Sequence, residues 1–287
     1  MNIPVITIQA KTIAEAYEAA LKAVYHQGIR IKTQYDKPGD PLSIDATMNI
    51  TILEPWSDPM IHKNFPGGFS DLREYVFELQ GAKDNWIKNM DDPKDTKWEY
   101  TYHGRLAHYG QYKASNELRG NNINQIESVI SKLVANPFTR QAQMITWDPS
   151  LDSDCYDPPC LQSIWYRLTE TNGEYYLNCN IRFRSNDCFG ASFFNIFGFT
   201  IFNREIVADE IQKRTGKKVN LGRLNWQADS FHVYGKDVQS LENLIINNNS
   251  PFETRTYNFH DPEIQEMYLM DDQAIKDKIE ETSRSLK

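Results

Sequence analysis

Helix-like and strand-like segments follow one another along this chain without the regular strand–helix–strand repeat of a parallel α/β fold. Apolar residues recur at helical spacing from Ile13 to Val24, behind a capping box that Thr12 and Glu15 would form. Further helices are predicted over 71–79, 126–134 and the later part of 192–213, and strands over 3–9, 46–54, 141–147, 161–169, 175–184 and 229–234. This irregular mixture predicts one α+β domain spanning residues 1–287.

Turn and cap residues separate these segments. Gly28 and Gly216 are placed to end helices, and Asn172-Gly173 is a hairpin turn signal between two strands. Residues 91–120 are polar and irregular, and their aromatics at 98–102 indicate a binding loop or a variable insertion. The charged residues 270–287 predict a solvated helix without a fixed anchor.

One cysteine stands in a local sequence that could make it reactive. Cys160 follows Pro158-Pro159, and prolines restrict the backbone, so the thiol would be held in a defined place. Arg184 comes at the end of the second strand of the predicted hairpin. A guanidinium near the thiol would lower the pKa of the thiol, and the thiolate is the strong nucleophile. We expect a nucleophile beside an anion-binding group, although a Pro-Pro-Cys sequence alone is more often a structural turn.

Charge and composition exclude several classes of protein. The net charge of −8 disfavours nonspecific nucleic-acid binding. No apolar run is long enough to cross a bilayer, and no signal peptide is expected at the N-terminus. None of the four cysteines forms a C-x-x-C pair, so no metal site is expected, and free thiols fit a cytoplasmic protein.

Several separated segments, taken in order, resemble one enzyme family. They are Asn124-Gln125, Pro137-Phe138-Thr139-Arg140, Trp147-Asp148-Pro149, Pro158-Pro159-Cys160, Phe183-Arg184-Ser185-Asn186-Asp187, Phe194-Asn195-Ile196, and Asp229 with His232-Val233-Tyr234. Together they resemble the thymidylate synthase family, including its pyrimidine hydroxymethylase branch, over roughly residues 12–240. Each motif alone is weak, but the ordered set at compatible spacing is highly specific.

The resemblance implies a folate-dependent enzyme acting on a pyrimidine nucleoside monophosphate. It also implies a homodimer with shared active sites, in which a mixed sheet with surrounding helices forms the interface. Cys160 would attack C6 of the pyrimidine ring, and Arg184 and Ser185 would bind the 5′-phosphate. Asn195 would pair with the O4 and N3–H edge of the base. Thiolate addition at C6 makes C5 nucleophilic toward the one-carbon unit of 5,10-methylenetetrahydrofolate, which divides one hard step into two.

The remaining site residues are also implied by the resemblance. His232 and Tyr234 would bind the sugar 3′-hydroxyl, Asp187 would support the folate, and Arg140 would reach the phosphate from the partner subunit. A glutamate on the helix before Gly81 would organise water and move protons to O4. Gap-free spacing selects Glu74 for this role, and Glu78, one turn later on the same face, is the rival.

This chain departs from the family pattern at several positions. Leu161 replaces the histidine that usually follows the cysteine, and Gln141 replaces the second arginine of an S-R-R pair. Another cation would then be needed for the phosphate, and Arg30 or Lys32 in the early loop are candidates. The end of the chain is unlike the apolar terminus that closes over the folate in the family. These changes indicate a divergent branch.

Three functions are consistent with these residues. The first is methylation of dUMP to dTMP, with methylenetetrahydrofolate giving both carbon and hydride. The second is 5-hydroxymethylation of dUMP, dCMP or CMP, in which water traps the intermediate. The third is a nucleotide- or RNA-binding paralogue without turnover. Asn195 favours uracil, because deoxycytidylate hydroxymethylases carry aspartate at that position.

Overall fold

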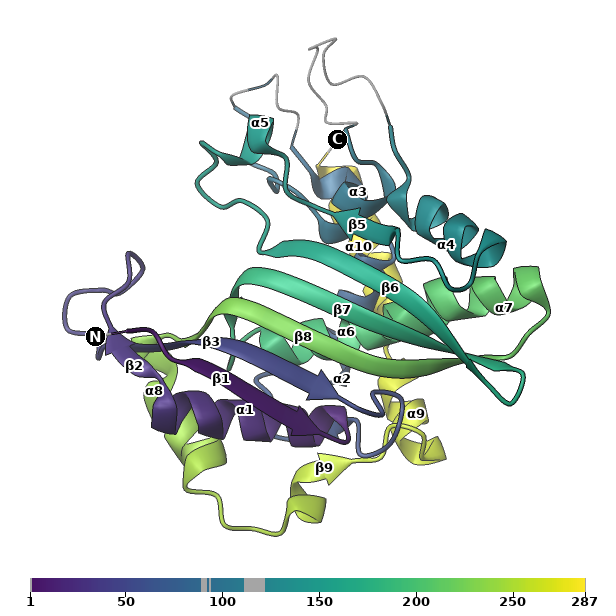
Figure 1. Ribbon diagram of the computed structural model, residues 1–287. Coiled ribbons are helices and arrows are strands. Elements are labelled where there is room, and N and C mark those ends of the chain that lie inside the picture. Colours follow the sequence, from purple (N-terminus) through teal and green to yellow (C-terminus); the bar gives the residue numbers. More distant parts are fainter. Residues whose placement is uncertain (1, 89–91, 93, 111–121, 287) are drawn as a thin grey trace.

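The computed structural model describes residues 2–88, 92, 94–110 and 122–286. Its centre is one mixed sheet with the strand order β1-β3-β8-β7-β6-β5, with β2 paired to β3 (Figure 1). The strands are β1 (Val5–Ala10), β2 (Ile29–Ile31), β3 (Ser43–Ile52), β5 (Ala142–Ile145), β6 (Leu161–Thr171), β7 (Glu174–Asp187) and β8 (Val219–Val233). β1 with β3 and β7 with β8 are parallel, and the other pairs are antiparallel. The α+β class and the mixed sheet are confirmed.

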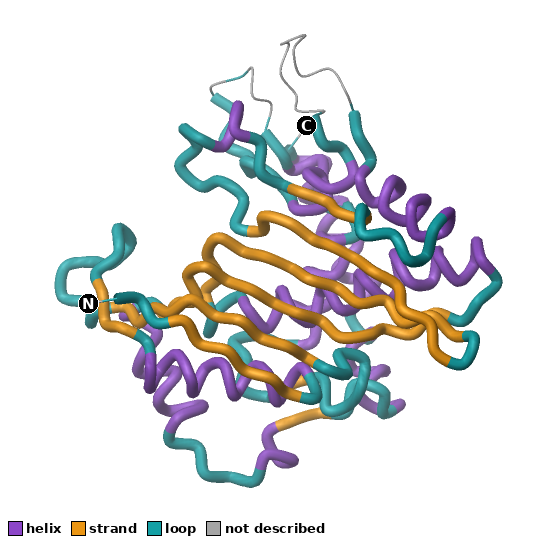
Figure 2. Tube along the Cα trace, in the orientation of Figure 1, coloured by secondary structure: helices purple, strands orange, loops and turns teal. Residues whose placement is uncertain are grey.

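Helices form layers against one face of this sheet. α1 (Ile13–Gln27) packs next to β1 and β3, and α6 (Ser192–Phe202) packs on β7 and β8 through Phe199; α2 (Phe69–Leu79) packs on α6. The other helices are α3 (Tyr102–Ala107), α4 (Gln125–Ala135), α5 (Pro149–Asp152), α7 (Asp209–Thr215), α8 (Val238–Leu241), α9 (Pro262–Leu269) and α10 (Asp272–Ser285). The sheet face turned toward the viewer in Figures 1 and 2 carries no helical layer within the described residues.

Short elements complete the description. A separate ribbon pairs β4 (Ile61–His62) with β9 (Thr256–Tyr257). Single helical turns are η1 (Asp84–Trp86), η4 (Gly235–Asp237) and η6 (Phe252–Arg255), and π-helical turns are η3 (Asn203–Ala208) and η5 (Glu242–Ile246). No helix in the described residues is both long and apolar enough to span a membrane.

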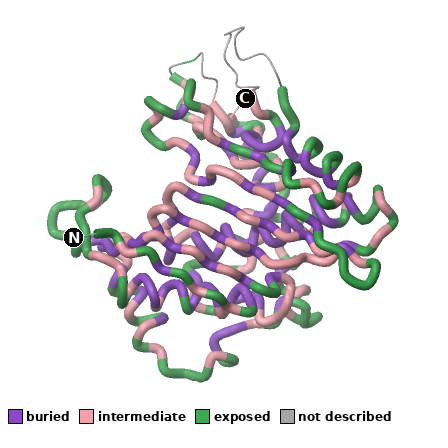
Figure 3. Tube along the Cα trace, viewed as in Figure 1, coloured by how far each residue is buried: buried purple, intermediate pink, exposed green. Residues whose placement is uncertain are grey.

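The core lies between the sheet and its helices. Buried and half-buried residues alternate along β7, as the two-residue period of a strand requires (Figure 3). Alternate β7 residues from Tyr175 to Phe183 are buried, and they pack in one cluster with the buried residues of α1 and α6. α6 is apolar around nearly its whole circumference, since it is enclosed between the sheet and α2.

Local sequence signals explain the element boundaries. Thr12 caps α1 and forms the expected capping box with Glu15, and Asn124 caps α4. The β6–β7 hairpin turns at Asn172 and Gly173, which both have positive φ of 53° and 81°. Helical structure from Ser192 ends at Gly216, whose φ is 70°. These predictions are confirmed.

Four boundary predictions are wrong. The strand expected at 229–234 begins ten residues earlier, at Val219, where β8 pairs with β7; the alternation of polar and apolar residues before 229 is interrupted at Gly222. The segment 91–120, expected to be irregular, contains α3, and parts of it lie outside the described residues. Arg30 lies on β2 rather than in a loop.

The fourth concerns the tail, which is helical but anchored. Ile275 and Ile279 of α10 are buried in a cluster with Phe77 of α2 and Trp86. The Trp86 indole donates to Ser283 Oγ at 2.9 Å, and Arg73 forms a two-pronged ion pair with Asp272.

Candidate active site

Cys160 immediately precedes β6 and lies beside the C-terminal end of β7. The register of these strands lets the Arg184 backbone N–H donate to the Cys160 carbonyl at 2.8 Å. The Arg184 guanidinium donates to the Pro159 carbonyl at 3.1 Å through Nε and to the Pro158 carbonyl at 2.5 Å through Nη2. The arginine therefore fixes the Pro-Pro turn that carries the half-buried cysteine.

The proton of Cys160 is subject to opposing influences. Burial raises the pKa of the Cys160 thiol, the nearby Arg184 charge lowers it, and Asp157 raises it. The net direction is upward, so the thiol is mostly protonated near neutral pH. Arg184 is the group that moves this thiol toward the reactive thiolate.

A cavity of about 500 Å³ has Asp157, three residues before this cysteine, in its wall, although neither Cys160 nor Arg184 lines it. Its wall combines aromatic, carboxylate and amide side chains from α2, the segment before α3, the loop before β6 and the start of α6: Tyr75, Glu78, Lys97, Trp98, Glu99, Tyr100, Thr101, Tyr102, Asp157, Ala191 and Asn195. Burial, together with the Cys160 charge among other groups, raises the phenol pKa values of Tyr75, Tyr100 and Tyr102. The three neutral phenols thus line the cavity close enough to Cys160 to feel its charge.

These tyrosines are the site residues that sequence reasoning missed. Tyr100 and Tyr102 belong to the aromatic segment 98–102, for which a binding loop was one of two interpretations. Their ring centroids are 5.6 Å apart. Tyr75 gave no signal, because an aromatic residue on an amphipathic helix usually packs in the core.

The two candidate glutamates occupy different environments. Glu78 lines the cavity, and burial raises the pKa of its carboxyl, although Lys83 at 3.2 Å opposes this. Glu74 does not line it and instead forms ion pairs with Lys83 at 2.9 Å and with Lys278 of α10 at 2.8 Å. Burial would raise the pKa of Glu74, but hydrogen bonds from Lys278 and Lys83 hold it below its ordinary value.

The end of β7 and the end of β8 bring a second polar group together. Asp187 pairs with His232 in the parallel register of these strands. The Ser185 hydroxyl lies 3.5 Å from His232 Nδ1, and the Tyr234 ring meets the His232 ring edge-on at 4.7 Å between centroids. The Asp187 carboxylate accepts from the Phe189 and Gly190 N–H groups at 3.1 and 2.9 Å. Burial, helped by the Asp187 charge, raises the pKa of Tyr234 to about 12.

Arg30 and Arg140 stand apart from these groups. Both are exposed, and no hydrogen bond within the described part of the chain joins either side chain to Cys160, Arg184 or Ser185. The Arg30 guanidinium lies over the Tyr25 ring at 5.7 Å. Arg140 precedes β5, and its carbonyl accepts from the Trp165 indole at 3.0 Å. The Arg140 side chain is therefore exposed at the edge of the sheet.

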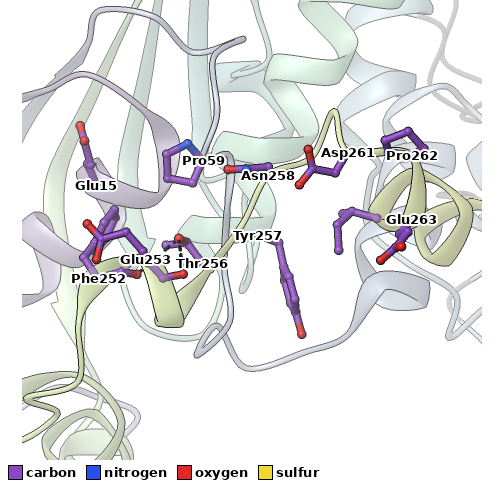
Figure 4. Close-up of a pocket in the computed structure, with 11 residues that line it drawn as sticks. Glu15, Pro59, Phe252, Glu253, Thr256, Tyr257, Asn258, Asp261, Pro262 and Glu263 are labelled. Atoms are coloured by element: carbon purple, nitrogen blue, oxygen red, sulfur yellow. Dashed lines mark hydrogen bonds between the residues drawn. The ribbon is translucent and has the colours of Figure 1, made fainter.

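A larger cavity of about 800 Å³ lies at the β4–β9 ribbon, away from all the predicted site residues (Figure 4). Its walls include the carboxylates of Glu15, Glu253, Asp261 and Glu263, which would repel a phosphate, and no cysteine. The smaller cavity is therefore the better candidate. No group of three or more His, Cys, Asp or Glu side chains among the described residues could hold a metal ion.

Comparison with known proteins adds independent findings. The family model described as thymidylate synthase matches residues 70–280. A protein of Methanosarcina barkeri named "Putative thymidylate synthase" is 27% identical over 238 residues, covering 83% of this chain and 94% of the relative. The thymidylate synthase of Saccharomyces cerevisiae is 28% identical over 188 residues, covering 63% of this chain and 56% of the relative.

A solved structure shows the same fold. The thermostable thymidylate synthase A from Bacillus subtilis aligns with a TM-score of 0.57 and 18% sequence identity, covering 82% of this chain and 84% of that chain.

Proposed function

This chain belongs to the thymidylate synthase family, and on that premise we propose that it converts dUMP to dTMP by covalent catalysis at Cys160. The observation that carries the proposal is the Cys160–Arg184 pair beside a cavity lined by Asn195 and Glu78. This arrangement brings together a thiol, a cation that favours the thiolate, and polar groups that can bind the base.

The first step would be attack by Cys160 Sγ on C6 of uracil, which breaks the C5–C6 π bond and moves its electron pair toward O4. Asn195 Nδ2 and the raised-pKa carboxyl of Glu78 can donate hydrogen bonds there and stabilise the enolate. C5 then becomes the nucleophile. Loss of the C5 proton and expulsion of Cys160 complete the exchange, and the buried phenols around the thiol can relay that proton.

Phosphate and sugar would be held at the ends of β7 and β8. Arg184 has five N–H donors, and two of them serve the Pro158 and Pro159 carbonyls, which leaves three for the 5′-phosphate. Ser185 would add a hydroxyl donor to the phosphate. His232 and Tyr234 would bind the 3′-hydroxyl from the neighbouring strand. Arg30 remains a candidate for an additional phosphate contact.

The aromatic walls of the cavity would offer stacking surfaces, Trp98 and Tyr100, to a flat ring such as that of 5,10-methylenetetrahydrofolate. Asp187, at the end of β7 and outside the residues that line this cavity, would be the supporting carboxylate. When bound, this molecule supplies the one-carbon unit and the hydride.

Arg140 would complete the phosphate site of a partner subunit. The helix-free sheet face offers room for a second copy, and this proposal makes the protein a homodimer with shared sites. The free thiols fit a reducing cytoplasm.

Incubation with dUMP and methylenetetrahydrofolate tests the proposal. We expect dihydrofolate absorbance to rise together with formation of dTMP, and the Cys160→Ala protein to give neither. A hydroxymethylated product without dihydrofolate would replace methylation by hydroxymethylation. Absence of any product would leave a nucleotide-binding protein without turnover.

A further inference from the structure

Tyr75 and Asn195 meet across the contact between α2 and α6. The Tyr75 hydroxyl donates a hydrogen bond to Asn195 Oδ1. Gly198, one turn beyond Asn195, makes room for the phenol, because a Cβ there would lie 2.8 Å from Tyr75 Cδ1. The ring also packs edge-on against Phe194, with centroids 6.3 Å apart. The two helices therefore hold the phenol in place against the amide.

This contact removes an ambiguity that an asparagine normally has. An amide can rotate by half a turn and exchange its oxygen for its nitrogen at little steric cost. Burial raises the pKa of the Tyr75 phenol well above its ordinary value, so the hydroxyl keeps its proton. Asn195 Oδ1 is the one hydrogen-bond acceptor that the described part of the chain gives this hydroxyl. A rotated amide would turn its NH2 group to the phenol and leave the O–H unpaired.

We propose that Tyr75 is a positioning residue that fixes the Asn195 amide with Nδ2 toward the cavity and thereby selects uracil over cytosine nucleotides. Among the described residues, Asn195 Nδ2 has no hydrogen-bond partner, and Asn195 lines the cavity. The 4-oxo group of uracil accepts from an amide N–H. The 4-amino group of cytosine would face it donor to donor. The inference rests on the proposed function, because it assumes that Asn195 meets the base.

The test is the ratio of dUMP to dCMP affinity, measured by calorimetry without the folate. Tyr75→Phe removes the hydroxyl and keeps the ring. We expect the ratio to fall about tenfold, which corresponds to one hydrogen bond of roughly 1.4 kcal/mol. Tyr166→Phe is the matched control, because Tyr166 also donates to an asparagine, Asn203 Oδ1, at 2.7 Å in the core and lines no part of the cavity. It should lose stability and keep the wild-type ratio.

Each outcome has a separate meaning. An unchanged ratio in a folded Tyr75→Phe protein whose wild type prefers dUMP overturns the inference and leaves the proposed function standing. A wild type that binds both nucleotides equally, or prefers dCMP, also overturns the inference. A wild type that binds neither nucleotide overturns the inference and the proposed function together. Should the phenylalanine variant fail to fold, Tyr75→Leu removes the same hydroxyl and gives the same reading.

Discussion

A cysteine becomes a strong nucleophile only as a thiolate, and the surroundings of Cys160 act on its proton in opposite directions. Burial and Asp157 favour the thiol, and Arg184 favours the thiolate. The same guanidinium holds the Pro158 and Pro159 carbonyls. Arg184 thus connects the position of the thiol to its reactivity, and a bound phosphate would add a third role.

Reaction of Cys160 with iodoacetamide should follow this balance. Its pKa is raised in the folded protein, so we expect the alkylation rate to rise with pH through a midpoint above the ordinary thiol value. Arg184→Leu removes the favourable charge and should move the midpoint higher. Arg167→Leu, an exposed arginine on β6, is the control and should not move it. Peptide mapping checks that the fully buried Cys179 and Cys188 stay unmodified. An unchanged midpoint in the Arg184→Leu protein would contradict the electrostatic influence of Arg184 on the Cys160 thiol.

The two glutamates of α2 give a second prediction at this scale. Glu78→Gln should lower kcat by about 10²–10⁴, the usual contribution of an acid–base group, because Glu78 lines the cavity. Glu74→Gln removes the carboxylate from ion pairs with the exposed Lys278 and the buried Lys83, which keeps Glu78 as a partner, and should lower stability while leaving kcat nearly unchanged. Steady-state kinetics of both variants show which glutamate acts in catalysis. The reverse pattern would assign the role to Glu74.

At the scale of elements, α10 supports the helix that carries the site. Arg73 and Glu74 of α2 form ion pairs with Asp272 and Lys278, and Ile279 packs beside Phe77. α2 also presents Tyr75 and Glu78 to the cavity. Packing of α10 against α2 therefore helps to hold the cavity-lining residues of α2 in place, although no residue of α10 lines the cavity.

Ile279→Ala should destabilise the protein by roughly 2 kcal/mol, because a buried side chain is truncated to leave a gap. Thermal unfolding should show a loss of about 4 °C for a chain of this size. Glu281→Ala, on the exposed side of the same helix, should stay within about 0.5 kcal/mol of wild type. Equal effects of the two changes would mean that α10 is not docked as described.

Elements fixed by local sequence signals could be predicted, whereas features that depend on contacts between residues far apart in sequence could not. α1, α4 and the β6–β7 hairpin were predictable, because caps, turns and periodicity are local signals. The full length of β8 was not predicted, since Gly222 interrupts the alternation in its first half and the pairing with β7, far away in sequence, carries the strand through. The docking of α10 depends on Phe77 and Trp86, far away in sequence. Ordered motifs indicated Cys160 and Arg184, whereas Tyr75 needed the approach of α6 at Gly198.

At the scale of the whole molecule, one face of the sheet is covered by helices and the other is not (Figure 1). The uncovered face carries polar and aromatic side chains such as Trp165, Tyr176 and Arg182. Arg140 is exposed at the β5 edge of the same sheet. A second copy on this face would cover the helix-free strands and place the exposed Arg140 at the subunit interface.

Complementation between inactive variants tests the shared site. Cys160→Ala and Arg140→Ala, each strongly impaired alone, should regain activity when refolded together, because a mixed dimer has one site with both lesions and one with none. Random pairing of equal amounts predicts about a quarter of wild-type activity. Two variants of the same residue, Cys160→Ala and Cys160→Ser, serve as the control and should give no recovery. No recovery after verified mixing would place Arg140 in its own subunit or outside the site.

The central claim is that Cys160 bonds covalently to the pyrimidine during one-carbon transfer. With 5-fluoro-dUMP and methylenetetrahydrofolate, the fluorine cannot leave C5 as a proton does, so the covalent complex should accumulate. Intact-protein mass spectrometry should show the added mass of both molecules, and digestion should map it to the Cys160 peptide. The Cys160→Ala protein should show no increase. An adduct on Cys155, the other thiol that is not fully buried, or no adduct in a protein that binds the nucleotide, would contradict the account.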